Sequence, residues 1–360
     1  MNRKGLWYID WGLMLPVLVL VCLSLATLFS LNFDYFRSQL IFLIISILVF
    51  LFFSQANYKI FQLYGVPIYF ASLFFLGLVL VLGIESRGSV RWLEILGFRI
   101  QFSEVFKPFL AISLSSYLVS LKKYSFKSLF TVMLLLLPVA FLIFLQPDLG
   151  DALIFVSVTI LTLMFFGFPW RFFLAGIVSV ALAFPIFWHF LHDYQKQRIL
   201  TYLNPGQDPL GSSYNAIQSI IAVGSGMVIG KGFGQGTQSV LNFLPERHTD
   251  FIFATISENL GFVGTLVILS AFLFLLYRIY IIYRNSTDMF CKVFTATCFF
   301  IILMQFFINT AMNIGLLPIV GVTLPFVSYG GSSLLSNFII LGLLTAVEKF
   351  TREDKVLEIG

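Results

Sequence analysis

Long apolar runs without strict alternation dominate the chain, and short polar segments separate them. A helix crosses the hydrocarbon core of a bilayer with about 20 apolar residues, whereas barrel strands alternate apolar and polar positions. The pattern therefore predicts one all-α, polytopic membrane domain over residues 1–360 and excludes a transmembrane barrel. Hydropathy predicts ten spans, near residues 11–31, 38–54, 66–84, 104–121, 129–146, 149–167, 171–191, 250–280, 290–314 and 330–348.

Lysine and arginine are distributed unevenly over the predicted loops. Most of them fall on the side of the two termini: Arg3, Lys4, Lys59, Lys122, Lys123, Lys127, Arg171, Arg278, Arg284, Lys292, Lys349, Arg352 and Lys355. The short loops on the other side hold only Arg37, Arg87, Arg91 and Arg99. Because basic loops stay in the cytoplasm, we expect both termini to be cytoplasmic and the protein to lie in the cytoplasmic (inner) membrane.

The composition agrees with a membrane protein and narrows its chemistry. Hydrophobic residues make up 59% of the chain and charged residues 11%, against about 25% charged in soluble domains. The net charge of +5 is explained by topology and anionic lipid, so we predict no nucleic-acid partner. Cys22, Cys291 and Cys298 lack metal-ligand spacing, and His189 and His192 lack a third ligand, so no metal site is predicted. The first apolar run lacks a cleavage site for a signal peptide.

Two predicted connections on the outer side are long, residues 85–103 and 192–249. The second joins the seventh and eighth spans and is the only large extracytoplasmic element. It contains a turn, NPGQDP (204–209), and an apolar stretch (214–230) that predicts a short helix at the membrane interface. Loops of this length tend to be functional, so we expect the chemistry on the outer face.

Ionisable residues at membrane depth are functional candidates, because an unpaired charge in hydrocarbon costs several kcal/mol. Five qualify, all near the outer ends of their spans: Glu104, Lys107, Asp148, Asp250 and Glu258. Glu104 and Lys107 stand at i,i+3, so they either form an internal salt bridge or present Lys107 to an anionic substrate. Asp148 either caps the following helix or pairs with Lys107.

The stretch FLPERHTDFIF (243–253) places four ionisable residues at the start of an apolar span: Glu246, Arg247, His248 and Asp250. Asp250, after Thr249, has two interpretations. It is a carboxylate favoured by a helix N-terminus, or it is a general base, since the helix end favours its charged form and apolar neighbours favour its neutral form. Arg247 and His248 add donors. Glu258, about two turns deeper, is expected to be a buried partner.

Two glycine-containing stretches invite a phosphate-binding interpretation. In GSGMVIGKGFGQG (224–236) the spacing is wrong for a P-loop and Lys231 is followed by Gly232, so we expect a flexible outer loop in which Lys231 can still meet a phosphate. PFVSYGGSS (325–333) contains Ser328, Gly330, Gly331 and a capping Ser332 or Ser333. A helix N-terminus there either binds an anion or follows a simple re-entrant turn.

Ordered motifs along almost the whole chain resemble the SEDS (shape, elongation, division and sporulation) family, specifically its RodA branch. They are RWLEILGFRIQFSEVFK (91–107), QPDLG (146–150), YNAIQS (214–219), GKGFGQGTQS (230–239), FLPERHTDFIFA (243–254), NIGLLPIVGVTLP (313–325) and SYGGSS (328–333). Arg247 resembles the elongation branch. The chain departs from the family at Phe102, where proline is usual, and at Asp151, where threonine is frequent; Asp151 adds a carboxylate without an assigned purpose.

The resemblance implies a peptidoglycan glycosyltransferase that polymerises lipid II outside the membrane, with a role in cell elongation and rod shape. By the same resemblance Asp250 matches an essential aspartate, and Glu104 and Lys107 match an important ion pair. Asp250 would deprotonate the acceptor 4-hydroxyl while undecaprenyl pyrophosphate leaves. Lys107, Arg247, other basic loop residues or a divalent cation such as Mg²⁺ or Mn²⁺ would supply positive charge to the leaving group.

The family's usual partner is a class B penicillin-binding protein, whose transpeptidase SxxK set is missing here, within a complex of elongation membrane proteins. Two alternatives remain at this stage. A lipid II flippase predicts ionisable groups at mid-membrane and internal repeats, neither of which is clear. A non-catalytic scaffold predicts that Asp250 is dispensable.

Overall fold

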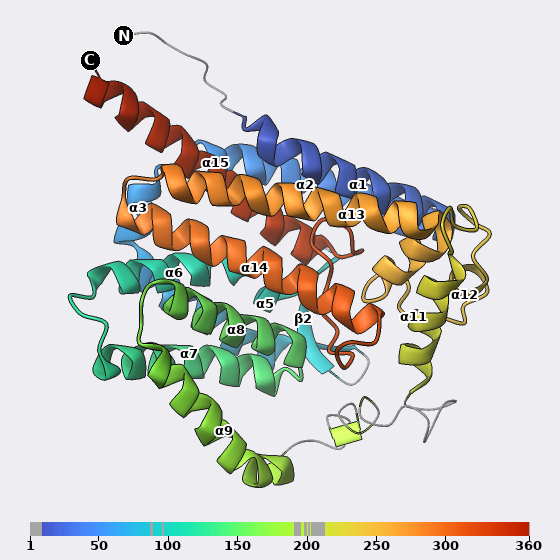
Figure 1. Cartoon of the computed structure of the whole chain (residues 1–360), viewed down its shortest axis with the longest axis horizontal. Coiled ribbons are helices and arrows are strands. Elements are labelled where there is room, and N and C mark those ends of the chain that lie inside the picture. The colour runs from blue at the N-terminus through green and yellow to red at the C-terminus, as the bar shows by residue number, and fades with distance from the viewer. Residues whose placement is uncertain are drawn as a thin grey trace.

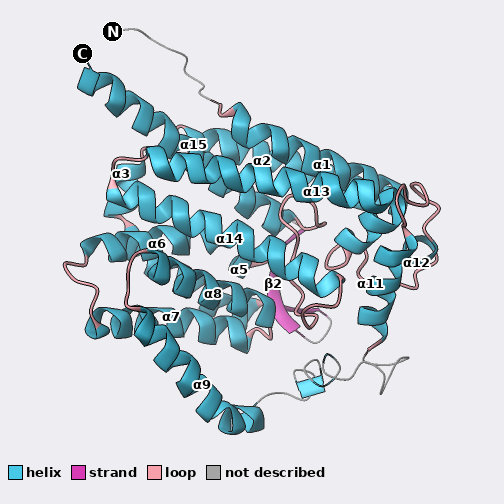
Figure 2. Cartoon of the chain, viewed as in Figure 1, coloured by secondary structure: helices cyan, strands magenta, loops and turns pink. Residues whose placement is uncertain are grey.

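The structure, a computed structural model, describes residues 9–86, 89–95, 97–190, 196–197, 200, 202 and 213–359, so the predicted turn at 204–209 lies outside the described residues. The described part is mostly helical (Figures 1 and 2). The helices are α1 (Trp11–Leu31), α2 (Phe33–Ser54), α3 (Tyr58–Leu63), α4 (Gly65–Leu82), α5 (Phe102–Val105), α6 (Lys107–Ser120), α7 (Phe126–Leu145), α8 (Leu149–Phe165), α9 (Trp170–Phe190), α11 (Tyr214–Ser225), α12 (Thr237–Val240), α13 (Ile252–Asn285), α14 (Met289–Asn313) and α15 (Gly331–Ile359).

Seven helices of the described chain are long and apolar enough to cross a membrane: α1, α2, α4, α7, α13, α14 and α15. α8 and the apolar part of α9, Trp170–Pro185, are shorter, and α6 has 14 residues. The structure therefore supports a protein with several membrane-spanning helices, and the count of ten spans stays a prediction.

The core lies between long helices that run side by side. α15 packs on α2, while α13 packs on both α1 and α14 (Figure 1). Buried aromatic side chains join these layers: Phe50 of α2 meets Phe338 of α15 with ring centroids 6.5 Å apart. Phe326, from the segment before α15, packs on the same Phe338 ring at 5.9 Å. The segment that carries the predicted PFVSYGGSS motif is thus anchored in the core.

The expectation of an all-α fold is wrong in one place. Residues 84–100 form a small antiparallel sheet, in the order β1 (Ile84–Ser86), β2 (Ser89–Ile95), β3 (Phe98–Ile100), drawn magenta in Figure 2. The strands are too short to show a clear alternation of apolar and polar residues in the sequence. They form because each strand pairs with its neighbour in the sheet. The sheet leads directly into α5 and so positions the residues around Glu104.

The glycine-rich stretch 224–236 is not a flexible loop. It lies against α13, which is kinked at Gly261, where φ is +65° and ψ is −156°. The kink breaks the helical ladder, and the Phe262 N–H donates instead to the Met227 carbonyl at 2.9 Å. The Lys231 N–H in turn donates to the Glu258 carbonyl at 3.0 Å. Backbone hydrogen bonds in both directions therefore fix this stretch to the helix.

Candidate active site

Asp250 lies on the turn that precedes α13, at the end of the bundle where α11 and α12 also lie (Figure 1). The helix starts at Ile252, and its cap position is Phe251 without a side-chain cap, so Asp250 does not cap it. The Asp250 carbonyl oxygen accepts hydrogen bonds from Asn309 Nδ2 at 3.0 Å and Asn313 Nδ2 at 2.9 Å. Its side chain is partly exposed. The two asparagines, at i,i+4 on α14, hold the backbone of the turn, and sequence reasoning missed them.

The turn is also fixed from the other side, by the segment before α15. The Tyr329 N–H donates to the His248 carbonyl at 2.9 Å, and Ser328 Oγ donates to the Thr249 carbonyl at 2.7 Å. Within the turn, Thr249 Oγ1 donates to the Glu246 carbonyl at 3.3 Å. The structure therefore brings together the two motifs that carry Asp250 and Ser328, which are far apart in the sequence.

Arg247 and His248 are both engaged by neighbours within the protein. The Arg247 guanidinium donates to the Asn242 side-chain oxygen, a neutral partner. The His248 ring stacks on Tyr35 of α2, with centroids 4.2 Å apart and an interplanar angle of 6°. Tyr35 is a third residue that the sequence did not single out, since only the packing of α2 against the turn places it there.

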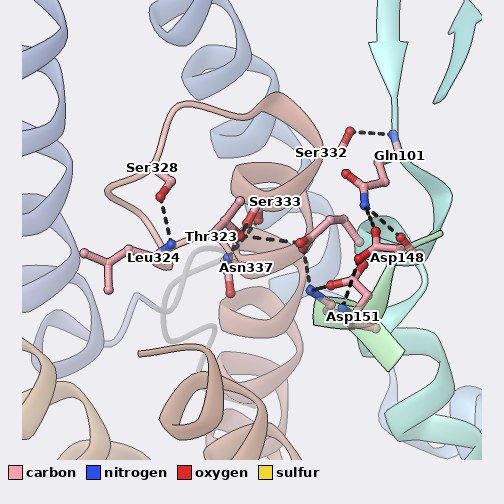
Figure 3. Close-up of polar contacts among 12 residues, drawn as sticks. Gln101, Asp148, Asp151, Thr323, Leu324, Ser328, Ser332, Ser333 and Asn337 are labelled. Carbon is pink, nitrogen blue, oxygen red and sulfur yellow. Dashed lines mark hydrogen bonds and ion pairs between the residues drawn. The ribbon is translucent and has the colours of Figure 1, made fainter. Parts of the chain in front are cut away.

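Gly330, Gly331 and Ser332, at the start of α15, make packing contacts and hydrogen bonds to neighbouring segments. The Gly330 N–H donates to Gln39 Oε1 at 3.2 Å, and a Cβ at Gly331 would overlap the Phe42 ring. Ser332 Oγ accepts the Gln101 N–H at 2.9 Å, a bond drawn at the upper right of Figure 3. These contacts favour a packed re-entrant turn over a helix N-terminus left open for an anion.

A buried charge cluster lies beside this segment. Lys107 Nζ contacts Glu104 Oε2 at 2.8 Å and Asp151 Oδ1 at 2.7 Å, and the lysine side chain is 1% exposed. The predicted Glu104–Lys107 pair is present, and Asp151, whose purpose the sequence left open, is the second partner. Lys107 is therefore held between two carboxylates inside the protein, and it also lines an apolar cavity between α4, α6, α7, α8 and α14.

Asp148 has the first of its two predicted roles. It caps α8 by accepting the Asp151 N–H at 3.1 Å. Its other oxygen accepts from Gln101 Nε2 at 2.5 Å and lies 3.6 Å from Arg91 of β2. The alternative, a pair with Lys107, is wrong because Asp151 takes that position. Figure 3 shows Gln101 and Asp148 meeting beside the cluster.

Lys231 forms an ion pair within the protein. Its Nζ lies 3.1 Å from Glu258 Oε1, and Glu258 also accepts the N–H groups of Gln238 and Ser239, each at 2.9 Å. Glu258 is fully buried. The interpretation of Glu258 as a buried partner is confirmed, and its partner is the lysine that had been considered for substrate.

One segment, residues 320–323, links the Asp250 turn to the charge cluster. A Cβ at Gly321, where φ is +76°, would lie 3.5 Å from Asp250 Oδ2. On the other flank, a Cβ at Gly150 would lie 2.8 Å from the Val320 carbonyl. Thr323 Oγ1 donates to Glu104 Oε1 at 3.4 Å. The Asp250 carboxylate thus faces backbone that also packs on the helix start carrying Asp148 and Asp151.

The site can transfer a proton, but the described residues offer no ready metal centre. Asp250 is a partly exposed carboxylate on a turn fixed from two sides, which suits a general base. No group of three or more His, Cys, Asp or Glu side chains in the described part of the chain is arranged to hold a metal ion. No step is therefore assigned to Mg²⁺ or Mn²⁺.

Comparison with known proteins gives a consistent set of relatives. A family model described as "Cell cycle protein", covering FtsW, RodA and SpoVE, matches residues 5–353. The chain is 33% identical over 354 residues to the peptidoglycan glycosyltransferase MrdB of Escherichia coli K12, covering 96% of each chain. It is 35% identical over 333 residues to the stage V sporulation protein E of Bacillus subtilis, covering 89% of this chain and 88% of that protein.

Solved structures agree. One, described as "Structural coordination of polymerization and crosslinking by a peptidoglycan synthase complex", is 30% identical with a TM-score of 0.85, covering 97% of this chain and all of that one. The rod shape determining protein RodA of Thermus thermophilus is 27% identical with a TM-score of 0.73, covering 96% and 98%. Because the family model matches residues 5–353 of its 360 residues, this multi-pass membrane protein belongs to the FtsW/RodA/SpoVE family, the SEDS proteins.

Proposed function

We propose that this protein is a peptidoglycan glycosyltransferase that polymerises lipid II on the outer face of the cytoplasmic membrane, with Asp250 as general base. The observation that carries the proposal is the Asp250 turn, held by Asn309 and Asn313 below and by residues 328–329 beside it, with its carboxylate partly exposed. Relatives named for this activity support the reaction class.

The reaction needs one base and one stabilised leaving group. Asp250 takes the proton of the acceptor 4-hydroxyl while that oxygen forms a bond to the anomeric carbon of the donor. The bond from that carbon to the pyrophosphate oxygen breaks, and its electron pair leaves with undecaprenyl pyrophosphate. Because this anion is a good leaving group, no second carboxylic acid is required, unlike in glycoside hydrolysis. The product has inverted configuration.

The topology supports placing the site outside. The N-terminal end of α1 and the C-terminal end of α15 lie together, opposite the end of the bundle that holds α11, α12 and the start of α13 (Figure 1). With ten spans and cytoplasmic termini, the Asp250 end faces outward. A class B penicillin-binding protein is the proposed partner, since the similar solved complex couples polymerization to crosslinking. Arg247 resembles the residue of the elongation branch at this position, which supports a role in cell elongation and rod shape.

The test is glycan synthesis by the purified chain on labelled lipid II, with and without the penicillin-binding protein. Asp250→Asn should lower the rate by at least about 10²-fold, the usual contribution of a general base. Asp34→Asn is the matched control, because Asp34 is an exposed carboxylate at the start of α2, and its rate should equal wild type.

Two outcomes would contradict the proposal. Normal polymerisation by a folded Asp250→Asn protein would remove the catalytic assignment. Translocation of lipid II into empty liposomes that is unaffected by Asp250→Asn, without glycan synthesis by wild type, would identify a flippase instead.

A further inference from the structure

The apolar cavity among α4, α6, α7, α8 and α14 has no role in the proposed reaction. It holds about 910 Å³ of space, within the range of about 300–1,000 Å³ that is typical of small-molecule sites. Ile154 and Val158 of α8 line it and are buried. Val66 and Phe70 of α4 also line it, and they are 65% and 62% exposed. The cavity therefore opens sideways beside α4, where a membrane protein meets lipid.

Most polar side chains in the cavity wall are engaged within the protein. Tyr69 Oη donates to a carbonyl of α7 at 2.7 Å. Ser113, Thr159 and Thr297 each donate to a carbonyl of their own helix, at 3.0, 2.8 and 2.8 Å. Lys107 contacts its two carboxylates. The wall thus presents mainly hydrocarbon to a ligand, and it favours an apolar chain over a polar molecule.

The mouth of the cavity lies toward the end of the bundle that holds the termini. α4 starts at Gly65, so Phe70 lies about 7.5 Å along the helix axis, at about 1.5 Å per residue. Tyr117, near the end of α6, is also a wall residue. The connection between α6 and α7 lies at the end of the bundle opposite α11 and α12 (Figure 1). With cytoplasmic termini, the mouth opens to the cytoplasmic leaflet.

Three lysines gather at this end of the cavity. Lys122 and Lys123 follow α6, and Lys127 lies in the first turn of α7. All three are exposed, and they form no ion pair with another described residue. Lys127 precedes the wall residue Val132 by five residues, about 7.5 Å along the helix. The lysines therefore lie at the level where a lipid chain in the cavity would place its phosphate.

We propose that the cavity binds an acyl chain of an anionic phospholipid from the cytoplasmic leaflet, and that the lysines of the α6–α7 connection bind its phosphate. Basic sites between membrane helices on the cytoplasmic side bind anionic head groups in this way. The apolar wall holds the chain, and Lys122, Lys123 and Lys127 select the head group. The inference goes beyond the proposed glycosyl transfer and uses only its topology, with the termini in the cytoplasm.

A polyprenyl tail of lipid II suits this cavity less well. Its phosphates lie at the outer face in the proposed reaction, across the membrane from Lys122, Lys123 and Lys127. A tail that came from the Asp250 end would also have to pass Lys107 and its two carboxylates. The charges thus favour a lipid whose head group lies on the cytoplasmic side.

The test is photolabelling of the full-length protein in nanodiscs of phosphatidylcholine. They contain a small share of phosphatidylglycerol that carries a diazirine near the end of one acyl chain. On illumination the diazirine loses N₂, and the carbene inserts into a nearby C–H bond that mass spectrometry locates. We expect label on Ile154 and Val158, which are 1% and 4% exposed, because a chain outside the protein does not reach them. Excess unlabelled phosphatidylglycerol should suppress this label, whereas excess phosphatidylcholine should not.

A pair of variants tests the head-group site. Lys122→Gln/Lys123→Gln should raise the phosphatidylglycerol concentration that halves the label by about 10-fold or more, the effect of two lysines beside an anionic lipid. Arg284→Gln/Lys349→Gln is the matched control. It removes the same charge from α13 and α15, which contribute no described residue to the cavity wall, and it should behave as wild type.

A second pair tests the chain site. Val139→Phe, at a wall position of α7 that is 2% exposed, fills part of the cavity and should lower the label on Ile154 and Val158. Leu137→Phe is the control on the same helix, because Leu137 is 61% exposed and does not line the cavity. Its label should equal that of wild type.

Label confined to outward-facing residues of α7 in the wild-type protein would overturn the inference. Equal suppression by phosphatidylglycerol and phosphatidylcholine would also overturn it, since the lysines would then select nothing. Displacement of the label by undecaprenyl phosphate, but not by phosphatidylglycerol, would assign the cavity to a polyprenyl tail instead. Glycan synthesis is measured separately on lipid II. A wild type that makes no glycan contradicts the proposed function, whereas the labelling results bear only on the lipid site.

Discussion

Lys107 is a buried lysine whose ammonium group lies between two carboxylates, Glu104 and Asp151. Glu104 is a neighbour on the same face of the chain, so the i,i+3 spacing predicted it. Asp151 comes from α8, and only the packing of the helices brings it to the lysine.

The cluster makes Lys107→Met a severe change. Methionine keeps the unbranched apolar stem but lacks the ammonium group, so it leaves Glu104 and Asp151 without their cation, which should cost about 3–5 kcal/mol. The thermal midpoint of the purified protein in detergent should fall accordingly. Adding Asp151→Asn should recover part of the loss, because one buried charge is then removed.

Lys123→Met is the control for this prediction, since Lys123 is exposed in the connection before α7. Its effect should stay within about 0.5 kcal/mol. Equal midpoints for Lys107→Met and Lys123→Met would show that the charge cluster does not stabilise the fold.

At the scale of elements, α11 and the glycine-rich stretch depend on close contact with α13. A Cβ at Gly226 would overlap the Ser257 carbonyl oxygen of α13, whereas a Cβ at Gly224 would meet no atom within 4 Å. The two glycines look equivalent in the sequence, and only one of them is required by the packing. This contact explains why a stretch that predicts a flexible loop is ordered.

Gly226→Ala should therefore destabilise the protein by about 1–3 kcal/mol, the usual cost of overpacking. Gly224→Ala, at the exposed end of α11, should be neutral or stabilising by up to about 1 kcal/mol, because alanine favours helix. Thermal midpoints of the two variants, measured side by side, check the difference. Identical midpoints would mean that α11 does not rest on α13 as described.

At the scale of the whole molecule, a second network of ion pairs joins three helices at the end of the bundle opposite Asp250. Arg278 of α13 contacts Asp10 at 2.9 Å and Glu348 of α15 at 2.5 Å. Both carboxylates are buried. One arginine of α13 thus joins the start of α1 to the last helix, α15.

Arg278→Gln should lower the free energy of unfolding by about 3–5 kcal/mol, since buried Asp10 loses its cation and buried Glu348 keeps only Arg352. Arg284→Gln, an exposed arginine at the end of the same helix, is the matched control and should change stability by less than about 0.5 kcal/mol. Thermal unfolding in detergent gives the comparison. Equal thermal midpoints for Arg278→Gln and Arg284→Gln would show that this charge network does not stabilise the fold.

The sequence alone determined the features that local patterns encode. Apolar runs of sufficient length predicted a helical membrane protein. The predicted spans that begin near residues 250 and 330 agree with the starts of α13 and α15. The clustering of polar residues singled out Asp250, Lys107 and Glu258, because a charge at the edge of an apolar run needs an explanation. These signals depend only on neighbours in the chain.

Only the tertiary structure decided which charges meet. Lys107 pairs with Asp151 and Lys231 pairs with Glu258, so both lysines that the sequence allowed as anion contacts have carboxylate partners within the protein. The contact between Gly321 and Asp250, and the sheet that carries Arg91, likewise join residues distant in the sequence. Such partners are determined by how the helices pack against one another. The pattern of apolar and polar residues within one segment does not determine which distant segment that segment will contact.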